Sequence, residues 1–385
     1  MIDVATKIHT RLASNANRVD SENVFPLENI DLLKETGLMS FLVPKQFGGY
    51  GGSIADFVKI ARVLGSACTS TGMIWAMHCQ QVACLVNHAT CEFKEVYLKK
   101  IGERNDFIGS VTTERSNLKS ILSSISPLTL NEQGYIQINR EAPVVTGGIN
   151  CDAYLITMKA NETAPNTDVK FVYATKDQLH ITMSSPTVDM LGMRGTNSIA
   201  LKIKGEIPPC QIVNKDFGFD EIAYSTMIPM GHIGWASCWL GAAVKAFNEI
   251  VKILRDPTNN KRFDINSDLL LEKIARVRMK LDIVASFIHS TYEEYEELLK
   301  SNCFQLRAPG FVIKINNLKV FSSECLFDSI NDLMEIGGVR FSYIKGQQNN
   351  IERVFRDLRS AALMINNDWL MISNGKLSLF DKSLR

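Results

Sequence analysis

Three titratable side chains are candidates for proton transfer. His78 lies inside the apolar stretch TGMIWAMHCQQVACLVNH, Glu114 follows two threonines in SVTTERSN, and Asp368 precedes an apolar run in NNDWLMI. An imidazole or a carboxylate held beside a substrate acts as a general acid or base. Each residue also has an ordinary structural alternative: a hydrogen-bonded core histidine, a solvated strand end and a helix N-cap, respectively.

A group of cysteines and histidines was considered as a metal site. Cys79, Cys84 and Cys91 lie close in sequence to His78 and His88. Their spacings match none of the common zinc patterns, and small buried cysteines are the usual explanation for such residues. We therefore expect no metal site.

Composition restricts the classes of partner. The 385 residues carry 42 Lys and Arg against 41 Asp and Glu, so there is no basic surplus for contacts along a phosphate backbone. No apolar run is long enough to span a bilayer or to serve as a secretion signal. Nine cysteines without a C-x-x-C pair favour free thiols. These features predict a cytoplasmic protein with no nucleic-acid or membrane partner.

Hydrophobic periodicity indicates the elements that must position these side chains. Apolar residues recur at helical spacing up to residue 104, and short alternating runs rich in β-branched residues follow from residue 106. Long helical stripes return after residue 220. This order predicts an α+β fold with a helical domain over residues 1–105, a β domain over 106–218 and a helical bundle over 219–385.

Four segments, in this order, resemble the acyl-CoA dehydrogenase superfamily: LLKETGLMSFLVPKQFGGYGG, LGSACTSTGMIWAMH, VDMLGMRGTNSIALKIKGEIPPCQIV, and IGGVRF with IERVFRDLRSA. The resemblance implies a middle antiparallel β-barrel or sheet domain and a C-terminal four-helix bundle. It also implies FAD completed by a neighbouring subunit, and an acyl thioester carried on coenzyme A or a carrier protein. In that family a carboxylate removes the α-proton while the β-hydrogen leaves as hydride to the flavin.

The resemblance assigns flavin contacts to two turns of the β domain. In SVTTERSN, Thr112 and Thr113 match the start of the family's Thr-Glu-Pro-Gly turn, although the family's glycines are missing. In VVTGG, Val145 and Thr146 match the second flavin turn, with Val144 at the position of a family Trp. The smaller Val144 leaves more room there.

A third assignment concerns the C-terminal region. Gly337 and Gly338 keep the family's tight loop, and Arg340 replaces a small residue where its guanidinium could meet a phosphate; a surface salt bridge is the alternative. Arg356 and Asp357 are expected to hold helices together rather than to contact substrate.

The family's base is missing from both of its known positions. Ile365 occupies the place of the usual Glu, and Tyr224 lies near the place used by a minority of members. Three replacements are considered. Asp368 stands one helical turn beyond Ile365, His78 matches a histidine that approaches the flavin in the superfamily's monooxygenases, and Glu114 flanks the first flavin turn.

These observations lead to three competing functions. The first is an FAD-dependent oxidoreductase that acts on an acyl thioester, with a separate electron acceptor. The second is a flavin-dependent monooxygenase supplied by a flavin reductase, which needs no α-proton base. The third is a flavin-poor paralogue without redox activity. A homodimer or homotetramer is expected in each case, from the resemblance and from the striped C-terminal helices.

Overall fold

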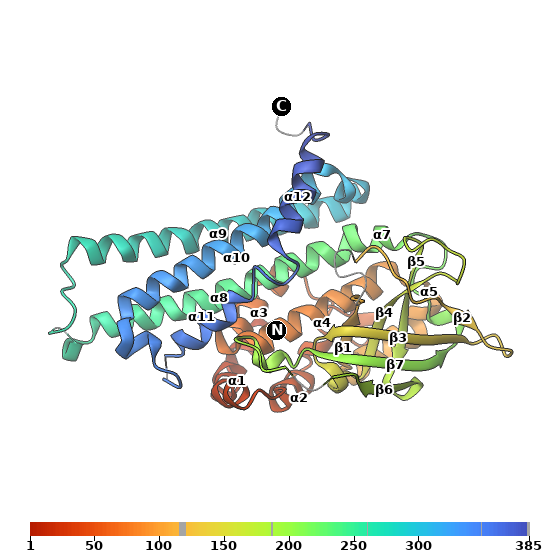
Figure 1. Cartoon of the computed structure of the whole chain (residues 1–385), viewed down its shortest axis with the longest axis horizontal. Helices are drawn as coiled ribbons and strands as arrows, with labels where there is room; N and C mark the ends of the chain where they lie inside the picture. The colour runs from red at the N-terminus through yellow and green to blue at the C-terminus, as the bar shows by residue number, and fades with distance from the viewer. Residues whose placement is uncertain (115–120, 186–187, 260, 348, 383–385) are drawn as a thin grey trace.

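The computed structural model describes residues 1–114, 121–185, 188–259, 261–347 and 349–382 (Figure 1). The predicted order of helices, strands and helices is confirmed. Among these described residues, no helix combines the length and apolar character that a bilayer span requires.

The N-terminal region is helical, and one of its helices is buried on almost every side. α1 buries Ala5, Ile8 and Leu12 at the three- and four-residue spacing of an amphipathic helix. Ser53 caps the start of α3, because its side chain accepts a hydrogen bond from the Asp56 amide. α4 is apolar around most of its circumference and therefore runs through the interior. The helices are α1 (Ile2–Glu22), α2 (Leu27–Glu35), α3 (Ile54–Ala67), α4 (Thr69–His88), α5 (Cys91–Phe93) and α6 (Lys99–Arg104).

The middle region contains two open sheets rather than a closed barrel. One has the order β1-β4-β5 and the other β2-β3-β7-β6. The pairing is antiparallel, as predicted, except that β1 runs parallel to β4. The β3–β7 ladder shifts register between Ala142 and Val145, which redirects the end of β3. The strands are β1 (Ile108–Val111), β2 (Thr129–Leu130), β3 (Ile136–Val145), β4 (Ala153–Lys159), β5 (Val169–Thr175), β6 (Leu179–Met183) and β7 (Ile199–Ile207).

The C-terminal region forms a bundle of α8, α9, α10 and α11, with α12 packed on α10 (Figure 1). This matches the predicted four-helix arrangement. The helices are α7 (Phe219–Ile222), α8 (Ile228–Arg255), α9 (Asp268–Ser301), α10 (Pro309–Gly338), α11 (Ile351–Arg359) and α12 (Asn367–Ser378).

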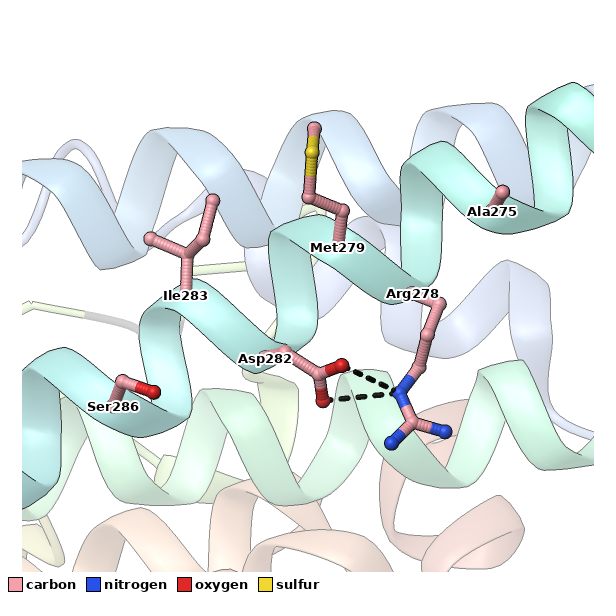
Figure 2. Close-up of a pocket in the computed structure, with 6 residues that line it drawn as sticks. All are labelled: Ala275, Arg278, Met279, Asp282, Ile283 and Ser286. Carbon is pink, nitrogen blue, oxygen red and sulfur yellow. Dashed lines mark hydrogen bonds and ion pairs between the residues drawn. The ribbon is translucent and has the colours of Figure 1, made fainter.

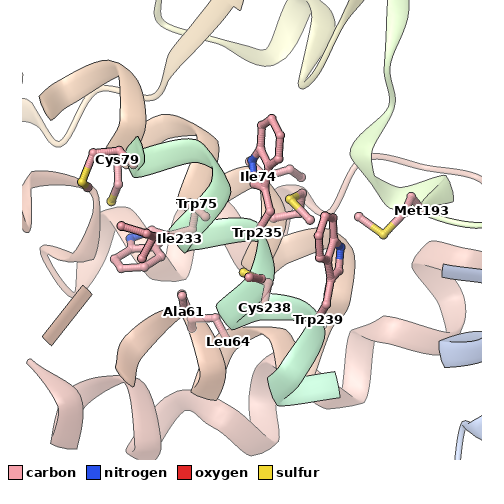
Figure 3. Packing of buried hydrophobic residues seen from close by; sticks show 14 of the residues in the cluster. Ala61, Leu64, Ile74, Trp75, Cys79, Met193, Ile233, Trp235, Cys238 and Trp239 are labelled. Carbon is pink, nitrogen blue, oxygen red and sulfur yellow. The ribbon is translucent and has the colours of Figure 1, made fainter. Parts of the chain in front are cut away.

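Helix α8 crosses α3 and α4 in the core, where Trp75, Trp235 and Trp239 are buried (Figure 3). The close crossing depends on small residues. A Cβ on Gly65 of α3 would lie 2.4 Å from the Cys238 carbonyl oxygen, and one on Gly241 would lie 2.1 Å from the Arg62 carbonyl oxygen. This contact joins the first and last thirds of the chain into one core.

Candidate functional site

The ends of β1 and β3 meet where the two sheets adjoin. Thr113 Oγ1 donates a hydrogen bond to the Val144 carbonyl oxygen at 3.2 Å, and this links the predicted turns of residues 112–113 and 144–146. The Val145 side chain is buried, whereas Val144 is 47% exposed. Neighbouring residues of a strand face opposite sides. Val144, which the resemblance places at the position of the family Trp, therefore offers its side chain to a ligand, whereas Val145 can offer only its backbone. Residues 112–113 and 144–146 are together called the β1–β3 edge.

Three hydroxyl groups cluster two residues further along the chain, around Thr146. Ser198 Oγ lies 3.2 Å from Thr146 Oγ1 and 3.1 Å from Thr196 Oγ1. Thr196 Oγ1 donates to the Met193 carbonyl oxygen, and the Gly147 amide donates to the Thr196 carbonyl oxygen at 3.0 Å. Sequence reasoning named Thr146 but missed Thr196 and Ser198. Their signal is the GMRGTNS segment, which lies in one of the four segments that carry the family resemblance.

Glu114 is not the solvated strand end that the sequence suggested. It is buried and forms an ion pair with Arg140, the pKa of which is lowered by burial to about 9. Its carboxylate also accepts hydrogen bonds from the Ile125 amide at 2.8 Å and from the Ser126 hydroxyl at 2.6 Å. These bonds favour a structural role for Glu114. Residues 115–117, expected to reshape this turn, lie outside the described residues.

His78 is hydrogen-bonded through both ring nitrogens. The Ile108 amide donates to Nδ1 at 3.0 Å, so Nε2 carries the proton and donates to the Met39 carbonyl oxygen at 2.6 Å. Burial lowers the pKa of His78 to about 4 and keeps the ring neutral. This geometry is that of a core histidine, and proton transfer through it would require one of these bonds to break.

The turn between α11 and α12 holds the position of the missing carboxylate. Ile365 has a left-handed backbone with φ 49°, and α12 begins only at Asn367. The prediction that Ile365 and Asp368 share a helix face is therefore wrong. The expected capping role of Asp368 is also wrong, because the Asn366 side chain caps α12 by accepting from the Asp368 amide at 2.8 Å. The Asp368 side chain is exposed.

Lys319 is a buried cation beneath this turn that sequence reasoning missed. Its Nζ donates to the Ile365 carbonyl oxygen at 2.7 Å and to Asn367 Oδ1 at 2.6 Å. Burial lowers the pKa of Lys319 to about 7. Its sequence signal was its place four residues after Ile315 on the buried face of α10.

The loop of residues 337–340 lies at the far end of the bundle. Gly338 has φ 58°, and a Cβ there would meet no atom within 4 Å. Arg340 is exposed, with its guanidinium 5.4 Å from the Phe341 ring centroid. In Figure 1 the C-terminal end of α10 lies at the opposite side of the molecule from the sheets. One chain therefore does not bring this loop to the β1–β3 edge.

Arg356 and Asp357 hold elements together, as predicted. Arg356 donates to both carboxylate oxygens of Asp20 on α1, at 2.9 and 2.6 Å. Asp357 Oδ1 accepts from the Met193 amide at 2.6 Å. Within the described part of the chain, no three His, Cys, Asp or Glu side chains gather as a metal site.

Known proteins match most of this chain. The model of the acyl-CoA dehydrogenase N-terminal domain matches residues 3–104, and that of the acyl-CoA dehydrogenase C-terminal domain matches residues 221–364. A short-chain-specific acyl-CoA dehydrogenase of Clostridium acetobutylicum is 26% identical over 61% of this chain and 62% of that protein, slightly under two thirds of its length. The probable acyl-CoA dehydrogenase YngJ of Bacillus subtilis is 24% identical over 90% of this chain and 88% of that protein.

A solved structure agrees in fold. FMN-bound TdsC from Paenibacillus sp. A11-2, a dibenzothiophene monooxygenase, superposes with a TM-score of 0.86 at 19% identity, over 98% of this chain and 97% of TdsC. At that identity the likeness establishes the fold alone. The two domain matches show that the chain belongs to the acyl-CoA dehydrogenase family of flavin oxidoreductases.

Proposed function

We propose that this protein is an FAD-dependent oxidoreductase that acts on an acyl thioester carried on coenzyme A or a carrier protein. The observation that carries the proposal is the β1–β3 edge, where three hydroxyls cluster around Thr146, two residues beyond the exposed apolar side chain of Val144, in a chain of this family.

The chemistry of this edge fits a flavin ring. The hydroxyls of Thr146 and Ser198 can donate or accept a hydrogen bond, and that of Thr196, which donates to Met193, can accept one; this suits a ring edge that alternates nitrogen and carbonyl groups. The exposed side chain of Val144 suits the apolar face of such a ring. Thr112 and Thr113 would contribute further hydroxyls. FAD, when bound, would supply hydride acceptance, and these residues would hold and orient it.

Removal of the α-proton requires a base, and Ile365 cannot provide one. His78 and Glu114 already use their polar atoms within the fold. We assign the base to Asp368, because its carboxylate lies in the first turn of α12, directly after the Ile365 turn, and Asn366 carries out the capping.

Spectroscopy tests this function directly. The purified protein is expected to be yellow, and its flavin absorbance should bleach under anaerobic conditions when the correct acyl thioester is added. Asp368→Asn should slow that bleaching by about a hundredfold or more, the size of a general-base contribution. Asp328→Asn, at an exposed carboxylate of α10, is the matched control and should change nothing. A colourless protein that binds no added FAD would refute the proposal.

A flavin-dependent monooxygenase is the second candidate. It is supported by the absence of a carboxylate at Ile365 and by the fold shared with TdsC. This reaction would depend on oxygen and on a flavin reductase as partner, and it would show no bleaching by thioesters. Full activity of Asp368→Asn would favour it, with His78 as the next residue to substitute.

We also propose a homo-oligomer, a dimer or a tetramer. The 337–340 loop lies away from the β1–β3 edge of its own chain, so a second copy would have to supply it. The outer face of α9 has a surface hollow in which Met279 and Ile283 point outward beside the Arg278–Asp282 ion pair (Figure 2). Apolar side chains also stay exposed on α12, including Met371 and Ile372. These surfaces suit contact with another copy of the chain.

A further inference from the structure

Two bulky residues, each in a turn between longer elements, adopt a strained backbone conformation. Within the described part of the chain, the residues with positive φ that are neither Gly nor Asn are Met193, with φ 55°, and Ile365, with φ 49°. Side chains beyond Cβ, and β-branched ones above all, disfavour this left-handed region, so the surrounding structure must hold both residues there.

Each strained residue is held by a buried charged side chain through its backbone. The Asp357 carboxylate accepts from the Met193 amide at 2.6 Å. The Lys319 ammonium donates to the Ile365 carbonyl oxygen at 2.7 Å and anchors the next turn through Asn367 Oδ1. Both side chains are almost completely shielded from solvent. Hydrogen bonds to charged groups are among the strongest in proteins.

The Met193 turn contacts the proposed flavin site, and the Ile365 turn holds the position that the resemblance assigns to the base. Met193 is joined to the hydroxyl cluster, because Thr196 donates to its carbonyl oxygen and Ser198 links Thr196 to Thr146. Ile365 occupies the position at which the family places its base, one residue before the cap of α12.

We propose that Lys319 and Asp357 are positioning residues, which hold the Ile365 and Met193 turns in the geometry that the proposed site needs. The inference rests on the proposed function for its catalytic consequence. The structural part of the proposal, in which Lys319 and Asp357 each hold one strained turn, depends only on their hydrogen bonds to Ile365 and Met193.

The surroundings of Lys319 make its hold sensitive to pH. Besides the oxygens of Ile365 and Asn367, it faces Glu324 on its own helix and His232 on α8. Burial lowers the pKa of Lys319 to about 7 and that of His232 to about 3, so only Lys319 changes its charge near neutrality. Above about pH 7 the neutral amine holds the Ile365 carbonyl less strongly.

Asp357 sets the lower pH limit, because its hold on the Met193 turn weakens in acid. It faces Arg353 and Arg356 on α11, Asp20 on α1 and the Cys68 thiol before α4. Burial raises its pKa to about 6. Below that value the carboxyl is protonated and accepts the Met193 amide less strongly. Asp357 and Lys319 are therefore both mainly charged only between about pH 6 and 7, where the two holds act together.

A double-mutant cycle tests the Lys319 hold. Lys319→Met should slow flavin reduction about tenfold or more, the equivalent of one hydrogen bond to a charged group. Glycine adopts positive φ without strain, so Ile365→Gly should remove the need for the hold. In that background, Lys319→Met should slow flavin reduction by about threefold or less.

Lys280→Met, which removes the Asp332 ion pair between α9 and α10, is the matched control and should leave the rate unchanged. Additive losses in the cycle would overturn the proposal.

A second readout separates this inference from the proposed function. Hydrogen exchange at residues 360–366 should speed up in Lys319→Met and return toward wild type when Ile365→Gly is added. If this coupling appears but no variant reduces flavin, the proposed function fails while the hold on the turn stands. If Lys319→Met does not fold, Ile365→Gly alone tests the proposal. The rate of flavin reduction in the wild type should decrease above about pH 7, and in Ile365→Gly this decrease should be absent. A decrease that remains in Ile365→Gly would refute the role of Lys319. Met193→Gly with Asp357→Asn provides the parallel cycle.

Discussion

At the scale of single residues, the buried Glu114–Arg140 pair explains why a residue next to the proposed flavin turn has a structural role. The carboxylate is neutralised by the guanidinium and its oxygens are used by the chain of residues 124–126. A buried charge that loses its partner destabilises a fold strongly.

Glu114→Gln should therefore lower the free energy of unfolding by about 3–5 kcal/mol, because Arg140 would stay buried without a counter-charge. Chemical denaturation measures this change. Glu141→Gln, which removes the exposed ion pair with Lys202, is the control and should alter stability by less than about 1 kcal/mol. A loss of turnover in Glu114→Gln without a loss of stability would return Glu114 to the list of proton-transfer residues.

Three histidines that are buried or half-buried should make the protein sensitive to acid. Burial lowers the pKa values of His78 and His88 to about 4 and that of His232 to about 3. Between about pH 6.5 and 4 the unfolded chain binds protons that the folded chain does not, so stability falls as the pH falls. Asp357, with its pKa raised to about 6, contributes a change in stability of the opposite sign but is a single group.

The melting temperature should thus drop from pH 6.5 to 4, and His232→Phe should reduce the slope of melting temperature against pH. An unchanged slope in that variant, with the exposed His289→Gln as control, would contradict this account.

At the scale of elements, the crossing of α3 and α8 fixes how the first and last regions of the chain meet. Gly65 and Gly241 bring the two backbones into direct contact, and this contact sets where α4 and its His78 lie beneath the sheets. Helix α11 adds a second junction, since Arg356 contacts α1 while Asp357 contacts the Met193 turn.

A pair of glycine substitutions tests the crossing. Gly65→Ala should destabilise the protein by about 1–3 kcal/mol, because its Cβ would meet the Cys238 backbone and overpack the core. Gly375→Ala is the matched control within α12, where a Cβ meets nothing within 4 Å, and it should stabilise by about 0.5–1 kcal/mol. Thermal unfolding of both variants gives the comparison. Equal effects would mean that the helices separate more easily than the structure indicates.

At the scale of the whole molecule, one chain holds the two halves of the proposed cofactor site far apart. The hydroxyl edge is in the β domain, and the Arg340 loop is at the distal end of the bundle (Figure 1). A symmetric dimer can bring the loop of each copy to the edge of the other.

Complementation between two inactive variants tests this arrangement. Thr146→Ala should disable the site of its own chain, and Arg340→Ala should disable the site of its neighbour. Mixed oligomers then contain one intact site, so random mixing should restore about a quarter of wild-type activity. Sedimentation should show at least a dimer at micromolar concentration. A monomer, or a mixture no more active than its parts, would contradict the shared site.

The sequence alone determined the family, the order of helices and strands, and the turns that meet at the β1–β3 edge. These follow from local information: apolar spacing selects helix or strand, and motif segments keep their order along the chain. The sequence also contains a signal for the buried position of Lys319, because Lys319 lies four residues after Ile315, on the same face of α10.

Tertiary structure alone decided what the polar residues do. The sequence suggests a solvated Glu114, but folding buries it against Arg140. The two hydrogen-bond partners of His78 are Met39, which precedes α4, and Ile108, which follows it. Ile365 was expected in a helix, yet its carbonyl meets Lys319, which is 46 residues away in sequence. The periodicity of apolar residues indicates which face of a helix or strand is buried. The role of a buried polar group depends on its hydrogen-bond or ion-pair partner, and that partner often comes from a distant part of the sequence, so local patterns do not predict it.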